Sequence, residues 1–127
     1  MITITPIYAG LLAVLFFWLS LRVSLIRMKG PAPDDAAKDR LRRAVRAQGN
    51  ASEYIPLGLI MLLVLEFQGA PLWLLHVFGL ALLIGRVGHF VSFNLASARL
   101  LTQASIVLTY AMICFSGLFA LYYAFIE

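Results

Sequence analysis

The chain has 127 residues, of which 62% are hydrophobic and 13% are charged, with a formal net charge of +4 and a mean hydropathy of +0.92. Soluble domains carry about 25% charged residues, so this composition excludes an ordinary water-soluble globular protein. The sequence predicts an integral membrane protein in which residues 1–127 form a single domain.

Apolar segments occur at approximately residues 4–26, 51–67, 71–90 and 100–126. A transmembrane helix needs about 20 apolar residues, so each segment approaches or reaches the length of one membrane span. The second segment is short unless its polar N-terminal turns belong to the same helix. We therefore predict an all-α, four-helix membrane bundle, with any chemistry located between the helices or at their ends.

All ten lysines and arginines lie on the side of the first and third connections, whereas Glu66 and Glu127 are the charges on the other side. By the positive-inside rule, the basic side is cytoplasmic and both termini are external. Aromatic residues near the external ends are typical of an interfacial belt. These are Tyr8, Trp73, Tyr122 and Tyr123. Because no basic residue precedes the first apolar run, we expect a retained helix rather than a cleaved signal peptide.

Turn and cap signals separate the segments. Gly30-Pro31-Ala32-Pro33 is expected to end the first helix, and either Asp34 or Asp35 to cap the second, which therefore begins outside the membrane. Pro56 removes one backbone donor inside the second helix and is expected to bend it beside a functional position. Gln68-Gly69-Ala70-Pro71 predicts a short turn to an antiparallel third helix.

The polar beginning of the second helix contains the strongest functional signal. Arg43, Arg46, Asn50 and Glu53 are three, four and three residues apart, which places them along one helix face. That face continues into an apolar segment, where ionisable groups are costly and tend to serve function. We predict a ligand site that contains Arg46, Asn50 and Glu53. In the alternative interpretation, the arginines mark the membrane surface and Glu53 pairs with Arg46 or Asn50.

The third helix carries Arg86 and His89 three residues apart, at about the same depth as Asn50. They can complete the same polar pocket. His76, nearer the external side, is expected to be a hydrogen-bonded packing residue. Arg22 in the first helix either extends to the cytoplasmic headgroups or reaches into the site. Arg99, at the start of the fourth helix, either marks the interface or points into the pocket from its mouth.

Small residues in the last two segments predict close helix packing. In and just after the third segment they are Ala81, Gly85, Gly88, Ser92 and Ala96, and in the fourth they are Ser116, Ala120 and Ala124. Cys114 is interpreted as a small apolar residue. We expect no metal site, because the two histidines are poorly spaced for one, and no nucleic-acid partner, because topology accounts for the basic surface.

The pattern Arg43-x-x-Arg46-Ala47-x-x-Asn50-x-x-Glu53-Tyr54-x-Pro56, followed by an apolar helix, a short turn and Gly85-Arg86-x-x-His89, resembles the MAPEG family. These are the membrane-associated proteins in eicosanoid and glutathione metabolism. The resemblance covers nearly the whole chain and is greatest to the bacterial inner-membrane branch. It implies a homotrimer that holds glutathione in polar pockets between neighbouring subunits, near the cytoplasmic face.

Matching positions in the family imply roles for individual residues. Glutathione contacts would come from Arg46, Asn50, Glu53 and Tyr54, with Arg43 and Arg22 as weaker matches. Arg86, which its spacing and depth place in the same pocket, is a further candidate contact. Gln48 would reach the site of a neighbouring subunit. Arg99 would take the place of the arginine that stabilises the thiolate, and His89 stands where relatives have an aromatic hydroxyl. Phe93 lacks the hydroxyl that relatives have at its position.

Glutathione chemistry agrees with these residue types. Its two carboxylates suit guanidinium groups, its ammonium suits Glu53, and its amides suit Asn50. A nearby cation favours the reactive thiolate over the thiol. We therefore expect a glutathione transferase or glutathione-dependent peroxidase that acts on lipophilic electrophiles from the bilayer. Glutathione would be its cosubstrate, with Arg99 and His89 as catalytic residues.

Two other classes remain open from the sequence. One is a small membrane transporter in which Glu53 is the membrane-embedded acidic residue. The other is a noncatalytic trimeric membrane protein that uses the polar pattern from Arg43 to Pro56 for packing or for binding alone.

Overall fold

The computed structural model describes residues 1–94 and 98–126, apart from the side chains of residues 93 and 94. Its elements are α1 (Ile4–Met28), α2 (Asp35–Phe67), α3 (Leu72–Asn94) and α4 (Arg99–Ile126), and the described residues contain no strand. Each helix is long and apolar enough to cross a membrane. The predicted all-helical membrane fold is confirmed, and α2 is the longest helix because its polar turns continue directly into the apolar segment.

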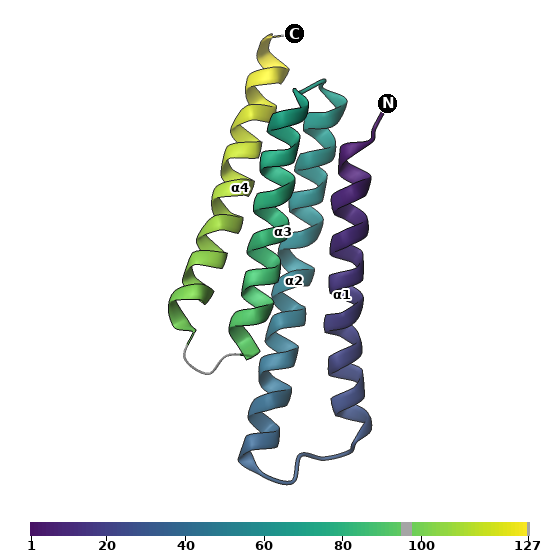
Figure 1. The fold of residues 1–127 in the computed structure, drawn as a ribbon, viewed down its shortest axis with the longest axis vertical. Coiled ribbons are helices and arrows are strands. Elements are labelled where there is room, and N and C mark those ends of the chain that lie inside the picture. The colour runs from purple at the N-terminus through teal and green to yellow at the C-terminus, as the bar shows by residue number, and fades with distance from the viewer. Residues whose placement is uncertain (95–97, 127) are drawn as a thin grey trace.

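Figure 1 shows the helices side by side, with both chain termini at one end and the α1–α2 connection at the other. Both α1 and α4 pack against the α2–α3 pair. This central hairpin turns at Gly69, whose φ of +77° lies in the left-handed region that favours glycine. The predicted short connection is confirmed.

The start of α2 is capped by Asp34, which resolves the choice between the two aspartates. Its Oδ1 accepts a hydrogen bond of 2.8 Å from the backbone N–H of Ala37. The helix then continues through Pro56 to Phe67 without interruption. The polar and apolar halves of α2 therefore form one continuous helix. Packing of the apolar half in the core thus fixes the direction in which the residues near Asn50 point.

The start of α1 is capped by a side chain from another helix. Glu66 accepts backbone N–H donors from Thr3 and Ile4 at Oε1, at 2.6 and 2.7 Å, and from Thr5 at Oε2, at 2.6 Å. The first N–H groups of a helix have no partner within the helix. Because this carboxylate supplies partners for these donors, it stabilises the start of α1 and ties it to the end of α2.

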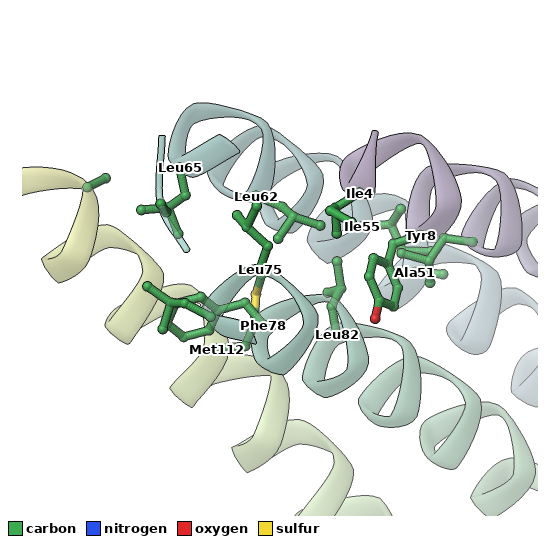
Figure 2. Packing of buried hydrophobic residues seen from close by; sticks show 14 of the residues in the cluster. Ile4, Tyr8, Ala51, Ile55, Leu62, Leu65, Leu75, Phe78, Leu82 and Met112 are labelled. Carbon is green, nitrogen blue, oxygen red and sulfur yellow. The ribbon is translucent and has the colours of Figure 1, made fainter. Parts of the chain in front are cut away.

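The apolar core lies mainly between α1, α2 and α3 (Figure 2), where Leu12, Leu62 and Leu82 are completely buried. Tyr8 also belongs to this core, at 4% exposure, and its ring occupies the space left by the missing side chain of Gly79. Its hydroxyl forms a 2.9 Å hydrogen bond with Nδ1 of His76. The packing role predicted for His76 is confirmed. The prediction that Tyr8 belongs to a lipid-facing belt is wrong, because Gly79 leaves room for the ring inside the bundle.

Small residues bring α3 and α4 close together, as predicted. A Cβ atom added at Gly85 would lie 2.5 Å from Oγ1 of Thr109, and one added at Gly88 would lie 2.5 Å from Oγ of Ser105. On α4, Ser116 and Ala120 are buried.

One residue of the predicted small-residue faces does not take part in this observed contact. Ala124 is exposed, because the last turns of α4 extend past the ends of the other helices (Figure 1). Ala96 lies outside the described residues.

Candidate functional site

A polar cavity of about 300 Å³ lies where α2, α3 and α4 meet. Its lining consists of Arg46 and Asn50 from α2, His89 from α3, and Thr102 and Ile106 from α4. We call it the α2–α4 cavity. His89 is buried, at 4% exposure, whereas Arg46 is exposed at the cavity edge. The fold thus brings together three residues that the sequence analysis assigned to one pocket.

Arg86 supports this cavity from inside the bundle, where it is only 2% exposed. Its Nε and Nη2 donate to Oγ1 of Thr109 at 3.2 and 2.8 Å, and its Nη1 donates to Oδ1 of Asn50. Thr109 in turn donates to the backbone carbonyl of Ser105 at 3.1 Å. A buried guanidinium is tolerated only when its donors are satisfied. This network therefore stabilises Arg86 and orients Asn50.

Tyr54 and Tyr110 extend the polar network towards the outer surface of the bundle. The guanidinium carbon of Arg86 lies 5.4 Å from the centroid of the Tyr54 ring, within the range of a cation–π interaction. The hydroxyl of Tyr54 is hydrogen-bonded to that of Tyr110 at 2.9 Å. Tyr110 is 51% exposed, so this hydroxyl pair reaches the outer surface of the bundle.

Glu53 is exposed and faces away from the packed interior. Among the described residues, the ion pairs of α2 join Asp39 to Arg43 at 2.6 Å and to Arg42 at 3.9 Å. Asn50 accepts its hydrogen bond from Arg86 instead of pairing with Glu53. The interpretation of Glu53 as a packing partner within its own helix thus gains no support from the described contacts.

The remaining predicted binding residues do not line the cavity. The guanidinium carbon of Arg22 lies 5.3 Å from the ring centroid of Phe90, so Arg22 joins α1 to α3. Arg43 is half-buried and paired with Asp39, and Gln48 is half-buried on another side of α2.

The two predicted catalytic residues differ in position. His89 lines the α2–α4 cavity, whereas Arg99, the first residue of α4, is exposed and is not among the lining residues. Within the single subunit, Arg99 is therefore at the end of the bundle near the cavity and not inside it.

Sequence reasoning missed the contribution of α4. Thr102, Ile106, Thr109 and Tyr110 were not assigned to the site, although Thr102, Ser105 and Thr109 are spaced three and four apart. Small polar residues at this spacing share one helix face. That pattern in an otherwise apolar helix was the available signal.

These features define an integral membrane protein with four spanning helices and a ligand-sized polar cavity near the end of the bundle opposite the termini. The profile of the MAPEG family matches residues 5–124, and the chain belongs to this family.

The chain is also similar to the inner membrane protein YecN of Escherichia coli K12 and to the protein of the same name in Escherichia coli O6:H1. Identity to each is 37% over 92 residues, which covers 72% of this chain and 70% of the relative. No solved structure matches. The chain is thus a multi-pass inner-membrane protein.

Proposed function

We propose that the protein binds glutathione in the α2–α4 cavity and uses it to conjugate lipophilic electrophiles or to reduce lipophilic peroxides. The observation that carries this proposal is the meeting of Arg46, Asn50 and His89 around one cavity, with buried Arg86 holding Asn50 in place. Membership of the MAPEG family supports the same ligand.

The polar groups complement the functional groups of glutathione. The Arg46 guanidinium suits a carboxylate of the tripeptide, since it offers several donors in one plane. Asn50 uses Oδ1 to accept from Arg86, which leaves its amide NH₂ to donate to a peptide carbonyl. Exposed Glu53 supplies the negative charge that the glutathione ammonium requires.

A neighbouring subunit completes the proposed site. The α2–α4 cavity has a volume of about 300 Å³, at the lower end of the roughly 300–1,000 Å³ of typical ligand pockets. Arg46 and Glu53 are exposed in the single subunit, so a second copy of the chain would enclose the ligand against them. This arrangement is a homotrimer, in which Gln48 of one subunit reaches the site of the next. A monomeric mass by light scattering in mild detergent would contradict a shared site.

In the proposed reaction, the glutathione thiol loses its proton and the thiolate sulfur forms a bond to an electrophilic carbon. In a substitution, the displaced electron pair departs with the leaving group; in an addition, the electron pair of the double bond moves to the neighbouring atom, which then takes up a proton. In the peroxide reaction, the thiolate sulfur instead attacks one peroxide oxygen, the O–O bond breaks, and the other oxygen takes up a proton and leaves as an alcohol or water. The sulfenic acid formed on the first glutathione then reacts with the thiol of a second glutathione, which gives the disulfide and water. Arg99 would favour the thiolate by its positive charge, and His89 and Tyr54 would supply hydrogen bonds.

Calorimetry with glutathione and the purified protein in detergent tests the binding proposal. Arg46→Ala should weaken binding by about 1.5–3 kcal/mol, the value of a hydrogen bond to a charged group. Glu53→Gln should also weaken it. The matched control is Arg42→Ala, which removes an exposed arginine of the same helix outside the cavity. Unchanged affinity in both site variants would exclude this glutathione site.

A further inference from the structure

A second cavity, of about 440 Å³, lies at the end of the bundle where α1 passes into α2. Ile26 from α1 and Leu41 from α2 contribute apolar walls, the segment 30–33 closes one side, and Lys29 and Arg40 contribute cations. We call it the α1–α2 cavity. It shares no lining residue with the α2–α4 cavity.

The connecting segment gives this cavity a defined shape. Gly30 has a φ of +86°, which ends α1, and Pro31 and Pro33 restrict the backbone that follows. The chain then enters α2 through the Asp34 cap. A ligand would therefore meet a largely preformed hollow, and little conformational entropy would be lost when it binds.

Positive charge dominates the lining of the α1–α2 cavity. The nine residues that line it, all in the described part of the chain, include two cations and no carboxylate. Of the three aspartates at the start of α2, Asp34 accepts from the backbone N–H of Ala37, Asp39 pairs with Arg43 and Arg42, and Asp35 is exposed outside the lining. The N-terminus of α2 adds a partial positive charge to the same region. The cavity therefore favours an anion with an adjoining apolar part.

The position of the α1–α2 cavity along the bundle indicates a lipid. At 1.5 Å per residue, the 25 residues of α1 span about 37 Å, against a hydrocarbon core of about 30 Å. The end of α1 therefore reaches the headgroup layer. This is the basic end of the bundle, which the positive-inside rule assigns to the cytoplasmic leaflet, where anionic lipids attract lysine and arginine.

We propose that the α1–α2 cavity binds the headgroup of an anionic phospholipid, with its phosphate between Lys29 and Arg40 and its glycerol region against Ile26 and Leu41. This proposal is independent of glutathione binding. It assigns a ligand to a cavity that the proposed reaction does not use.

Native mass spectrometry of the detergent-purified protein, titrated with phosphatidylglycerol, tests this site. Lys29→Gln/Arg40→Gln should weaken lipid binding by roughly fivefold for each cation removed. The control is Arg27→Gln/Lys38→Gln, which removes the same charge from the ends of α1 and α2 beside the connection, at residues outside the lining. It should retain most of the affinity. Equal losses in the two double variants would show diffuse attraction and overturn the proposal.

Two further binding experiments test which ligand binds and whether it binds in the α1–α2 cavity. Phosphatidylcholine and the soluble headgroup glycerophosphoglycerol should both bind much more weakly than phosphatidylglycerol. Equal binding of phosphatidylcholine would exclude charge recognition, and equal binding of the soluble headgroup would indicate a site for aqueous phosphate compounds.

Ala37→Phe should fill the cavity without changing its charge and should reduce lipid binding, with helicity checked by circular dichroism. Normal lipid affinity in a folded Ala37→Phe variant would place the lipid elsewhere.

Discussion

The hydroxyl groups of Tyr54 on α2 and Tyr110 on α4 lie 2.9 Å apart, and their ring centroids are separated by 5.4 Å. Residues 56 positions apart in the sequence thus meet beside the α2–α4 cavity. The contact links two helices directly, and the cation–π interaction of Tyr54 with Arg86 adds α3. Because this network depends on all three helices, its loss should affect the whole half of the bundle that contains the α2–α4 cavity.

We predict that Tyr54→Phe and Tyr110→Phe are strongly non-additive. Each substitution breaks the same hydrogen bond, so the double variant should lower the thermal unfolding temperature hardly more than either single variant. Tyr122→Phe, at an exposed position near the other end of α4, is the control and should have little effect. Additive effects of the two substitutions would show that the hydroxyls do not interact.

Asn50 should contribute to stability as well as to ligand binding. Asn50→Ala removes an acceptor from the buried Arg86 guanidinium, which leaves a charged donor unsatisfied. We expect a loss of roughly 1.5–3 kcal/mol in the free energy of unfolding, measured in mixed micelles without glutathione. Ser52→Ala is the control, because Ser52 is exposed and its hydroxyl bonds only within its own helix, to the carbonyl of Gly49. Equal stability of the two variants would argue against the Arg86 network.

Glycine at position 85 should be required for the contact between α3 and α4. Gly85→Ala places a methyl group against Oγ1 of Thr109 and the backbone carbonyl of Ser105. The backbone carbonyl cannot rotate away, so we expect a destabilisation of about 1–3 kcal/mol and a disturbed Arg86–Thr109 hydrogen bond. Gly117→Ala is the matched control, since nothing lies within 4 Å of its added Cβ. The two variants can be compared by denaturant unfolding in detergent, and equal stability would contradict the close approach.

Arg99 should change the pKa of the glutathione thiol without changing the affinity for the protonated tripeptide. If Arg99 stabilises the sulfur anion, Arg99→Ala should leave glutathione affinity nearly unchanged at a pH where the thiol is protonated. It should raise the pKa of the bound thiol and slow turnover. A pH titration of thiolate absorbance for bound glutathione measures this pKa. The same thiol pKa in wild type and Arg99→Ala would remove Arg99 from the mechanism.

Orientation of the bundle is testable by labelling. In a Cys114→Ala background, cysteine at Lys38 should react from the cytoplasmic side and cysteine at Gln68 from the external side. The reason is the concentration of basic residues at the end that contains Lys38. Membrane-impermeant reagents label external cysteines in intact cells and cytoplasmic cysteines in inverted vesicles. Reversed accessibility would place the α2–α4 cavity on the external side of the membrane.

Much of the fold was predictable because apolar length and turn residues determine where a membrane helix begins and ends. Asp34, Gly69 and the small residues at Gly85 and Gly88 all take the roles that their residue types indicated. The convergence of Asn50, Arg86 and His89 was also predicted, because helical spacing and membrane depth place them at one level.

The contribution of α4 was not predictable to the same extent. Its sequence is apolar apart from a stripe of small polar residues at Thr102, Ser105 and Thr109, so hydropathy gives only a weak indication of its rotation about its own axis. Only packing against Gly85 and Gly88 brings Thr109 to Arg86 and Tyr110 to Tyr54. Tyr8 shows the same limit, because its burial depends on the space at Gly79, on a different helix.

The central position of the α2–α3 hairpin has a consequence for thermodynamic coupling. Among the described residues, α1 and α4 each contact this hairpin and do not contact each other. Substitutions on these two flanking helices should therefore have additive effects on stability, to within about 0.3–0.5 kcal/mol, as expected for sites without shared partners. Substitutions in α1 can then change the stability of the protein without altering the contribution of α4, and the reverse also holds, provided that the α2–α3 hairpin is kept.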